Sequence, residues 1–111
     1  MTRKPRTHVR RWFSATLDRA TNILEPVRGC RTVKVDEVGS QISETRGPNR
    51  RLVLNVGDQA ILFGPDSEIQ SATIEHVDLD GYRERWRVKL GYGALSPSTR
   101  VVQVLAGMKA R

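Results

Sequence analysis

Residues 82–90 alternate strictly between two kinds of side chain. The run reads Tyr-Arg-Glu-Arg-Trp-Arg-Val-Lys-Leu. One side carries Tyr82, Trp86, Val88 and Leu90, with Glu84 among them, and the other side carries Arg83, Arg85, Arg87 and Lys89. A period of two residues is typical of a β-strand with one buried face and one wet face, and it disfavours a helix. The sequence therefore predicts a strand whose apolar side meets a core and whose cations meet solvent or a partner.

The preceding segment, residues 69–77, is predicted to pair with this strand as a hairpin. A three-residue loop over residues 79–81 places Gly81 where the common three-residue hairpin needs a left-handed residue. This register sets Ile74 opposite Trp86 on the apolar side and Glu75 opposite Arg85 on the wet side. A slip of one residue would reverse both faces, so the hydrophobic pattern favours this register.

Short strand segments separated by turn signals continue along most of the chain. Residues 36–50 form a polar loop or a weakly paired hairpin. Strands are predicted over residues 32–35, 51–55, 59–63, 69–77, 82–90 and 101–105, with Gly-Asp, Gly-Pro-Asp and Gly-rich turns between them. This spacing is typical of a small barrel or sandwich. With 111 residues in one domain, we expect a mainly β fold: a small five- to six-stranded, SH3-like barrel over residues 30–111.

A helix is predicted before the barrel, over residues 9–24. Phe13, Leu17, Ala20 and Leu24 recur at helical spacing on one face, and Pro26 ends the segment. We therefore divide the chain into a basic arm (residues 1–11), a helix and linker (12–29) and the barrel (30–111). The apolar stripe of the helix is expected to dock on the barrel, because isolated helices of this length are marginally stable.

The net charge of +7 is confined to the first third of the chain. Residues 1–34 carry nine basic and two acidic side chains, whereas the remainder is balanced and residues 58–80 contain six carboxylates and no cation. Such asymmetry indicates an anionic partner for the arm, although a basic tail can also serve solubility alone.

The candidate contacts with DNA or another anion are Arg3, Lys4, Arg6, Arg10, Arg11, Arg83, Arg85, Arg87 and Lys89. The four strand cations can equally form a solvated face that neighbouring residues partly neutralise. Val9 and Trp12 are the candidate apolar contacts between subunits.

No chemistry-bearing motif is found. His8 and His76 stand far apart and Cys30 is the single cysteine, so we predict no metal site, no cofactor and no disulfide. Asp78-Leu79-Asp80-Gly81 is better explained as a hairpin turn than as part of a calcium loop, because Lys89 stands where that loop needs a glutamate. No apolar run reaches the length of a membrane span. The chain is predicted to be non-enzymatic, and Cys30 to be a buried or half-buried thiol.

Residues 56–105 resemble small five-stranded barrels of the KOW type. The resemblance is carried by Val56-Gly57-Asp58, Gly64-Pro65-Asp66, Asp80-Gly81 and Gly91. It departs from that family at Ser71 and Ala72, where the family has an internal glycine. The resemblance implies binding to nucleic acid, or to transcription and ribosomal partners, in the cytoplasm.

A second resemblance, to small head–tail joining proteins of tailed phages, covers more of the chain. It is carried by residues 13–24, Gly57-Asp58, residues 69–77, Asp80-Gly81 and Leu90-Gly91. It implies a non-enzymatic connector component, assembled in the host cytoplasm and located in the virion. Its partners would be copies of itself in a ring, neighbouring virion proteins and, non-specifically, packaged DNA. The KOW-type nucleic-acid-binding module is the alternative.

Overall fold

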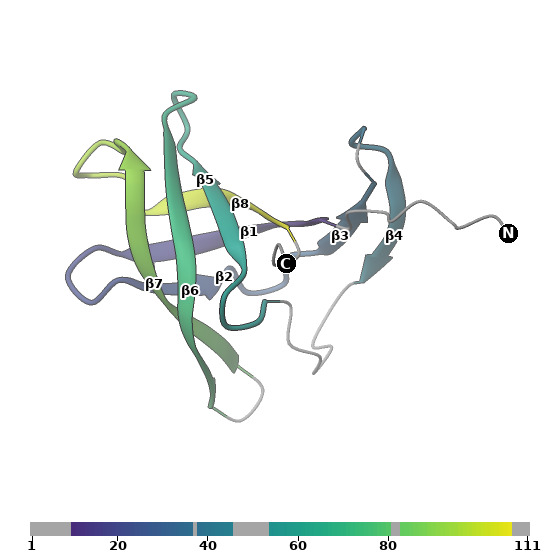
Figure 1. Cartoon of the computed structure of the whole chain (residues 1–111), viewed down its shortest axis with the longest axis horizontal. Helices are drawn as coiled ribbons and strands as arrows, with labels where there is room; N and C mark the ends of the chain where they lie inside the picture. The colour runs from purple at the N-terminus through teal and green to yellow at the C-terminus, as the bar shows by residue number, and fades with distance from the viewer. Residues whose placement is uncertain (1–9, 37, 46–53, 81–82, 108–111) are drawn as a thin grey trace, which may run out of the picture.

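The computed structural model describes residues 10–36, 38–45, 54–80 and 83–107, and their regular structure is entirely β. Figure 1 shows the eight strands. They are β1 (Arg10–Asp18), β2 (Ile23–Pro26), β3 (Thr32–Val35), β4 (Gln41–Thr45), β5 (Gln59–Phe63), β6 (Ile69–Asp80), β7 (Arg83–Gly93) and β8 (Val101–Gly107). The mainly β fold is confirmed.

Six of these strands close into an antiparallel barrel. Their order around the barrel is β1, β2, β7, β6, β5, β8 and back to β1. β8 pairs along one edge of β1, from Thr16 opposite Val101 to Arg10 opposite Gly107. β2 pairs with the other edge of β1, from Ala15 opposite Pro26 to Asp18 opposite Ile23, and this pairing closes the ring. Closure gives each barrel strand a neighbour on both sides.

The predicted N-terminal helix is wrong, because the segment from Arg10 to Pro26 forms β1, a turn and β2. Phe13, Ala15 and Leu17 alternate into the barrel interior and are buried. The spacing of Phe13 and Leu17 fits both a helix and a strand, and the small apolar Ala15 between them fits the strand. Asp18 shapes the turn: its carbonyl accepts from the Asn22 amide (2.7 Å) and its carboxylate accepts from the Ala20 amide (3.0 Å). Asn22 takes the left-handed conformation that such a turn needs, with φ of 58°.

Two further expectations are corrected. The predicted strand over residues 51–55 is represented among the described residues by Leu54 and Asn55, and neither lies in a strand. The predicted three-residue loop over 79–81 is also wrong, because Leu79 and Asp80 lie in β6 and pair with Glu84 and Arg83.

The predicted register between β6 and β7 is wrong as well. Ile74 pairs with Val88, and beyond an irregularity Val77 pairs with Trp86 and Asp78 with Arg85. Glu75 and His76 are both exposed at this irregularity, so the inward side changes from the even to the odd residues of β6. A β-bulge has this effect because it inserts one residue that has no partner. The sheet thereby keeps Ala72 and Ile74 of the first half and Val77 of the second half on its inner side.

The core fills the barrel with the inward side chains of all six strands. Trp86 is fully buried and packs on Phe13 of β1, with ring centroids 5.4 Å apart and the planes inclined by 57°. Leu54 and Leu95, which lie outside the strands, are buried in the same cluster. The other buried members are Ala15, Leu17, Leu24, Ala60, Leu62, Ala72, Ile74, Val88, Val102, Val104 and Ala106.

β3 and β4 form a hairpin that stands outside the barrel (Figure 1). β3 pairs with Arg10–Trp12 of β1, further along the edge that β2 uses, so β2 and β3 share one edge. Residues 27–31 connect them: the Val27 amide donates to the Ser14 carbonyl, and the Cys30 amide donates to the Val27 carbonyl. Among the described strands, β4 pairs with β3 alone.

We predict that Trp86→Ala lowers the free energy of unfolding by about 3–5 kcal/mol, because it leaves a large cavity at the centre of the barrel. That is a large share of the roughly 5–15 kcal/mol that stabilises a typical domain. Denaturant unfolding followed by circular dichroism measures the change. The control is Arg87→Ala, on the next and exposed residue of β7, with an expected change within about 0.5 kcal/mol. Equal effects of the two substitutions would contradict the assignment of the core.

Candidate interaction surfaces

The outer side of β7 carries the cations that its alternation predicts. Trp86 and Val88 are buried, whereas Arg83, Arg87 and Lys89 are exposed and Arg85 is partly exposed. Leu90 packs against the core, while Tyr82 lies outside the described residues. The two-sided pattern is therefore confirmed for the residues that the structure describes. We call this side of β7, together with the exposed residues His76 and Asp78 of β6, the charged face.

Two of the four β7 cations are neutralised within the molecule. Arg83 pairs with Glu25 of β2 at 2.7 Å, and Arg85 pairs with Asp78 of β6 at 2.9 Å. Arg87 stands opposite His76 and Lys89 opposite Thr73, and neither cation forms an ion pair with another described residue. The positive potential available to an anionic partner is thus concentrated on Arg87 and Lys89.

The remaining predicted contacts are only partly visible. Arg3, Lys4, Arg6 and Val9 lie outside the described residues, whereas Arg10 and Arg11 begin β1 and pair in register with β3 and β8. Two cations that the sequence analysis passed over, Arg19 and Arg100, are exposed at the barrel end formed by the β1–β2 turn and the loop after β7. The Arg19 guanidinium donates to the Ser96 carbonyl at 3.2 Å, and the Leu17 amide donates to the Arg100 carbonyl at 2.8 Å. The same turn reaches β7, because the Val88 amide donates to the Asn22 carbonyl.

The acidic segment 58–80 does not form one uniform patch. Asp58 is buried, and its carboxylate accepts from the Asn55 amide at 2.9 Å, so it holds a turn. Asp78 is engaged by Arg85, and the Glu68 carboxylate accepts from the Thr99 hydroxyl at 3.4 Å. Much of the acidity that the sequence presents as a counterpart for the basic arm therefore serves the fold.

On the opposite side of the barrel, the outward side chains carry no charge between Arg10 and Asp18, which stand at the two ends of β1. This side is built by β1, β8, β5 and the first half of β6, and β8 at its centre lies three strands from β7 in either direction. Its members are Trp12, Ser14 and Thr16 of β1; Val101, Gln103 and Leu105 of β8; Gln59, Ile61 and Phe63 of β5; and Ile69, Ser71 and Thr73 of β6. None of them is buried, and Ile69 and Val101 are 50% and 54% exposed. In a chain with 28% charged residues, an outer surface without charge indicates a site of contact. We call it the uncharged face.

Aromatic and aliphatic side chains cross the uncharged face in a continuous row. Pairing in register places Val33 beside Trp12, Trp12 beside Leu105 and Leu105 beside Ile61. Trp12 also meets Phe63 edge to face, with ring centroids 5.5 Å apart and the planes at 72°. Trp12, predicted as a contact between subunits, is therefore half-buried within an apolar row on the outside of the barrel.

The polar side chains of the uncharged face already have partners within the molecule. The Gln103 amide donates to the Ser14 hydroxyl (2.8 Å), and the Thr73 hydroxyl donates to the Gln59 side-chain oxygen (3.2 Å). The Ser71 hydroxyl accepts from the Tyr92 amide at 2.8 Å. A polar group that is already paired loses less when water is removed from it. The free-energy cost of removing water from this face is therefore small.

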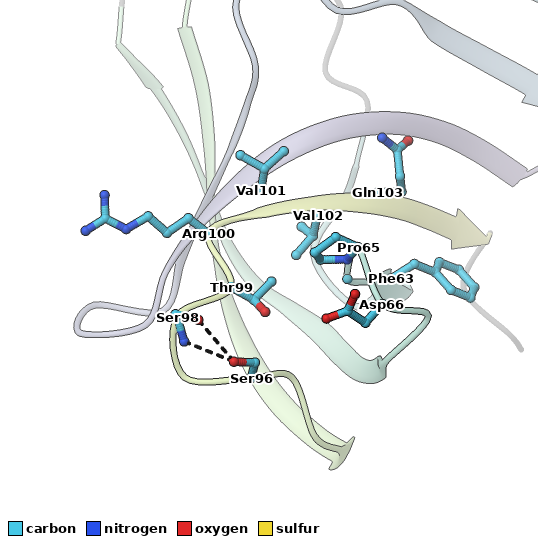
Figure 2. A pocket seen from close by; sticks show the side chains of 11 residues that line it. Phe63, Pro65, Asp66, Ser96, Ser98, Thr99, Arg100, Val101, Val102 and Gln103 are labelled. Atoms are coloured by element: carbon cyan, nitrogen blue, oxygen red, sulfur yellow. Dashed lines mark hydrogen bonds between the residues drawn. The ribbon is translucent and has the colours of Figure 1, made fainter.

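A shallow groove of about 440 Å³ adjoins one end of the uncharged face. Figure 2 shows it between the turn after β5, with Pro65 and Asp66, and the segment from Ser96 to Gln103. Phe63, Val101 and Gln103 belong to both the groove and the face. Ser98 and Ser96 bond to each other at its rim, with their hydroxyl oxygens 3.1 Å apart. The groove therefore continues the face at Phe63, Val101 and Gln103, and Asp66 and Arg100 add two charged side chains to its lining.

The residues that the structure describes contain no cluster of three His, Cys, Asp or Glu side chains placed to hold a metal ion. In the same part of the chain, no helix is long and apolar enough to cross a membrane. Comparison of the chain with protein-family models, with curated protein sequences and with solved structures finds no match. The function is therefore inferred from the surfaces described above.

Cys30 lies partly buried against the core, and burial raises the pKa of its thiol. The thiolate is the reactive form, so we predict slow alkylation of the native protein by iodoacetamide at neutral pH. The rate should rise with pH through a midpoint above the ordinary value of a cysteine thiol. The same thiol in denaturant is the control and should react faster. Equal rates in the folded and unfolded chains would show that the fold does not protect Cys30.

Proposed function

We propose that this chain is a non-enzymatic structural protein that assembles with copies of itself and with neighbouring proteins. The observation that carries the proposal is the β3–β4 hairpin, which leaves the closed barrel and presents β4 without a second neighbour among the described strands. An unpaired strand edge exposes backbone donors and acceptors in a row and is a template for another chain. In a molecule that otherwise closes its sheet, such an edge favours assembly.

The side chains of the hairpin support the same proposal. Val38 at its tip is 83% exposed and Ile42 in β4 is 52% exposed. Gln41, Ser43 and Glu44 are exposed as well, so all the described side chains of β4 are accessible. β4 contains no lysine and no proline, two of the residues that commonly protect an exposed edge.

The resemblance to phage head–tail joining proteins gives this assembly its most specific form, although its helical element is replaced by β1 and β2 and only the strand and turn motifs after Val56 still carry it. We infer a ring component of a virion connector, built in the host cytoplasm, that acts through contacts between subunits and needs no cofactor. The separation of an uncharged face from a charged face suits such a role, because one face is available for protein and the other for an anionic surface.

The test is the native mass of the purified protein, measured over a range of concentrations, for the wild type and two single substitutions. We expect the wild type to form oligomers and Ile42→Lys to shift them towards monomer, because a lysine on the edge strand opposes pairing. Val56→Lys is the matched control, since Val56 is 56% exposed and lies outside the hairpin. A wild type that stays monomeric, or an equal loss in both variants, would contradict the proposal.

Nucleic-acid binding by a small barrel of the KOW or SH3-like kind is a second candidate. It is favoured by Arg87 and Lys89, which have no ion-pair partner among the described residues, and by Arg19 and Arg100 at the nearby end of the barrel. Contacts of this type go to phosphates, and the affinity therefore depends on salt and not on base sequence.

Two double substitutions test this second candidate with the same loss of charge. Binding to duplex DNA should weaken more in Arg87→Gln/Lys89→Gln than in Arg83→Gln/Arg85→Gln, because the latter pair of cations is already engaged. The slope of log affinity against log salt should fall in magnitude by about 2 in the first variant only. Fluorescence anisotropy at several salt concentrations measures both quantities. Equal losses in the two variants, or no binding by the wild type, would remove this candidate.

A further inference from the structure

We infer that the uncharged face receives the β3–β4 hairpin of a second copy of this chain, so that subunits join head to tail. The inference rests on the proposed self-assembly and names the two surfaces that meet. One surface is the row of Trp12, Leu105 and Ile61, extended by Phe63 to the groove. The other is the projecting hairpin with Val38 and Ile42.

The hairpin of the same molecule does not cover this face. β3 is hydrogen-bonded to Arg10–Trp12 of β1, and Val33 continues the row that Trp12 begins. The hairpin is therefore a sideways continuation of the sheet and lies beside the face, where Figure 1 shows it projecting from the barrel. No other described element of the chain lies over the face, and the inference assigns that role to another molecule.

The size of the face fits a hairpin better than a globular partner. Four strands about 4.8 Å apart, with three outward residues on each, span roughly 14 Å by 13 Å between backbone positions. With side chains this corresponds to about 400 Å², roughly half of what one partner contributes to a standard interface. β3 and β4, with four and five residues, are about 13–17 Å long. A two-stranded hairpin therefore matches the face, and a ring subunit that both gives and receives one doubles the area.

The charges of the hairpin also fit a surface that carries none. Arg31, just before β3, pairs with Glu44 of β4 at 2.9 Å. The Asp36 carboxylate accepts from the Val38 and Ser40 amides at 3.0 and 2.8 Å. Lys34 is the one charged side chain of the described hairpin without a partner there. The exposed surface of the described hairpin therefore carries little unpaired charge, which suits contact with the uncharged face.

The contact joins two different surfaces, so it is heterologous. β3 lies at the start of β1, whereas the groove lies beyond the Thr16–Val101 pair near the end of β1. A protomer that gives its hairpin at one end and receives another along the face leaves both surfaces available for the next copies. Contacts of this kind generate rings when the rotation closes and filaments when it does not.

Cysteine cross-linking between two differently tagged copies tests the inference. In a Cys30→Ala background, one copy carries Ile42→Cys in the hairpin and the other carries Ile61→Cys on the uncharged face. Mild oxidation should give the mixed dimer in larger amount than either copy gives alone. As a control, Arg87→Cys on the charged face replaces Ile61→Cys and should not cross-link, because Arg87 pairs with His76 and not with a residue of the uncharged face. Thermal unfolding of each variant verifies that it is folded.

Each other outcome overturns the inference in a recognisable way. Cross-linking of the Ile42→Cys copy with itself would show that β4 edges pair with each other. Cross-linking of the Ile61→Cys copy with itself would show that two faces meet directly. An oligomeric wild type without any 42–61 link leaves the proposed assembly intact but rejects this contact, whereas a monomeric wild type rejects both.

A charge introduced on the face gives an independent measurement. Ile61→Asp should weaken self-association at least about tenfold, because it would bury an unpaired carboxylate. His76→Asp, at an exposed position on the charged face, should leave it unchanged. Equal self-association of both variants and the wild type would overturn the inference.

Discussion

The structure depends on the pairing of β1 with β2, because this contact closes the sheet. Without it, β1 and β2 would each present an open edge and the inward side chains would face water. The turn that makes the contact is short and is held by Asp18, which binds two backbone amides. Closure in turn brings Phe13 of β1 against Trp86 of β7, two residues that are distant in sequence and central to the core. Local turn chemistry and global packing thus support the same arrangement.

The sequence pattern was most informative where one strand alone determines the outcome. The alternation of residues 82–90 predicted which side of β7 is buried, and the turn signals located β3 and β5 at their observed limits. The N-terminal segment was misassigned because a spacing of four residues satisfies the helical and the strand period at once. The bulge in β6 was not visible, since Glu75 and His76 are both polar and nothing in their identity shows that they are consecutive outward residues.

The interaction surfaces were harder to predict because they combine strands that are far apart in the chain. The Arg83–Glu25 pair depends on β2 lying beside β7, and no local pattern predicts that neighbour. The same applies to Arg19 and Arg100, which only the folded barrel brings to one end. The uncharged face did leave a signal: the outward positions of β5 and β8 all lack charge, and those of β1 lack it between Arg10 and Asp18. This lack of charge can be recognised in the sequence once the inward positions of each strand are known.

β2 and β3 follow each other in the chain and share one edge of β1, and this arrangement determines how the hairpin is oriented. β3 is attached to three residues of β1, so the direction of the hairpin relative to the barrel axis follows from the twist of that end and from residues 27–31. Gly29 holds the left-handed conformation there, with φ of 77°. In the proposed assembly, a hairpin bound to a neighbouring copy would transmit its direction as the rotation between successive subunits. The curvature of the assembly, and with it the number of subunits in a closed turn, would then be encoded in a five-residue connection and not in the contact surfaces.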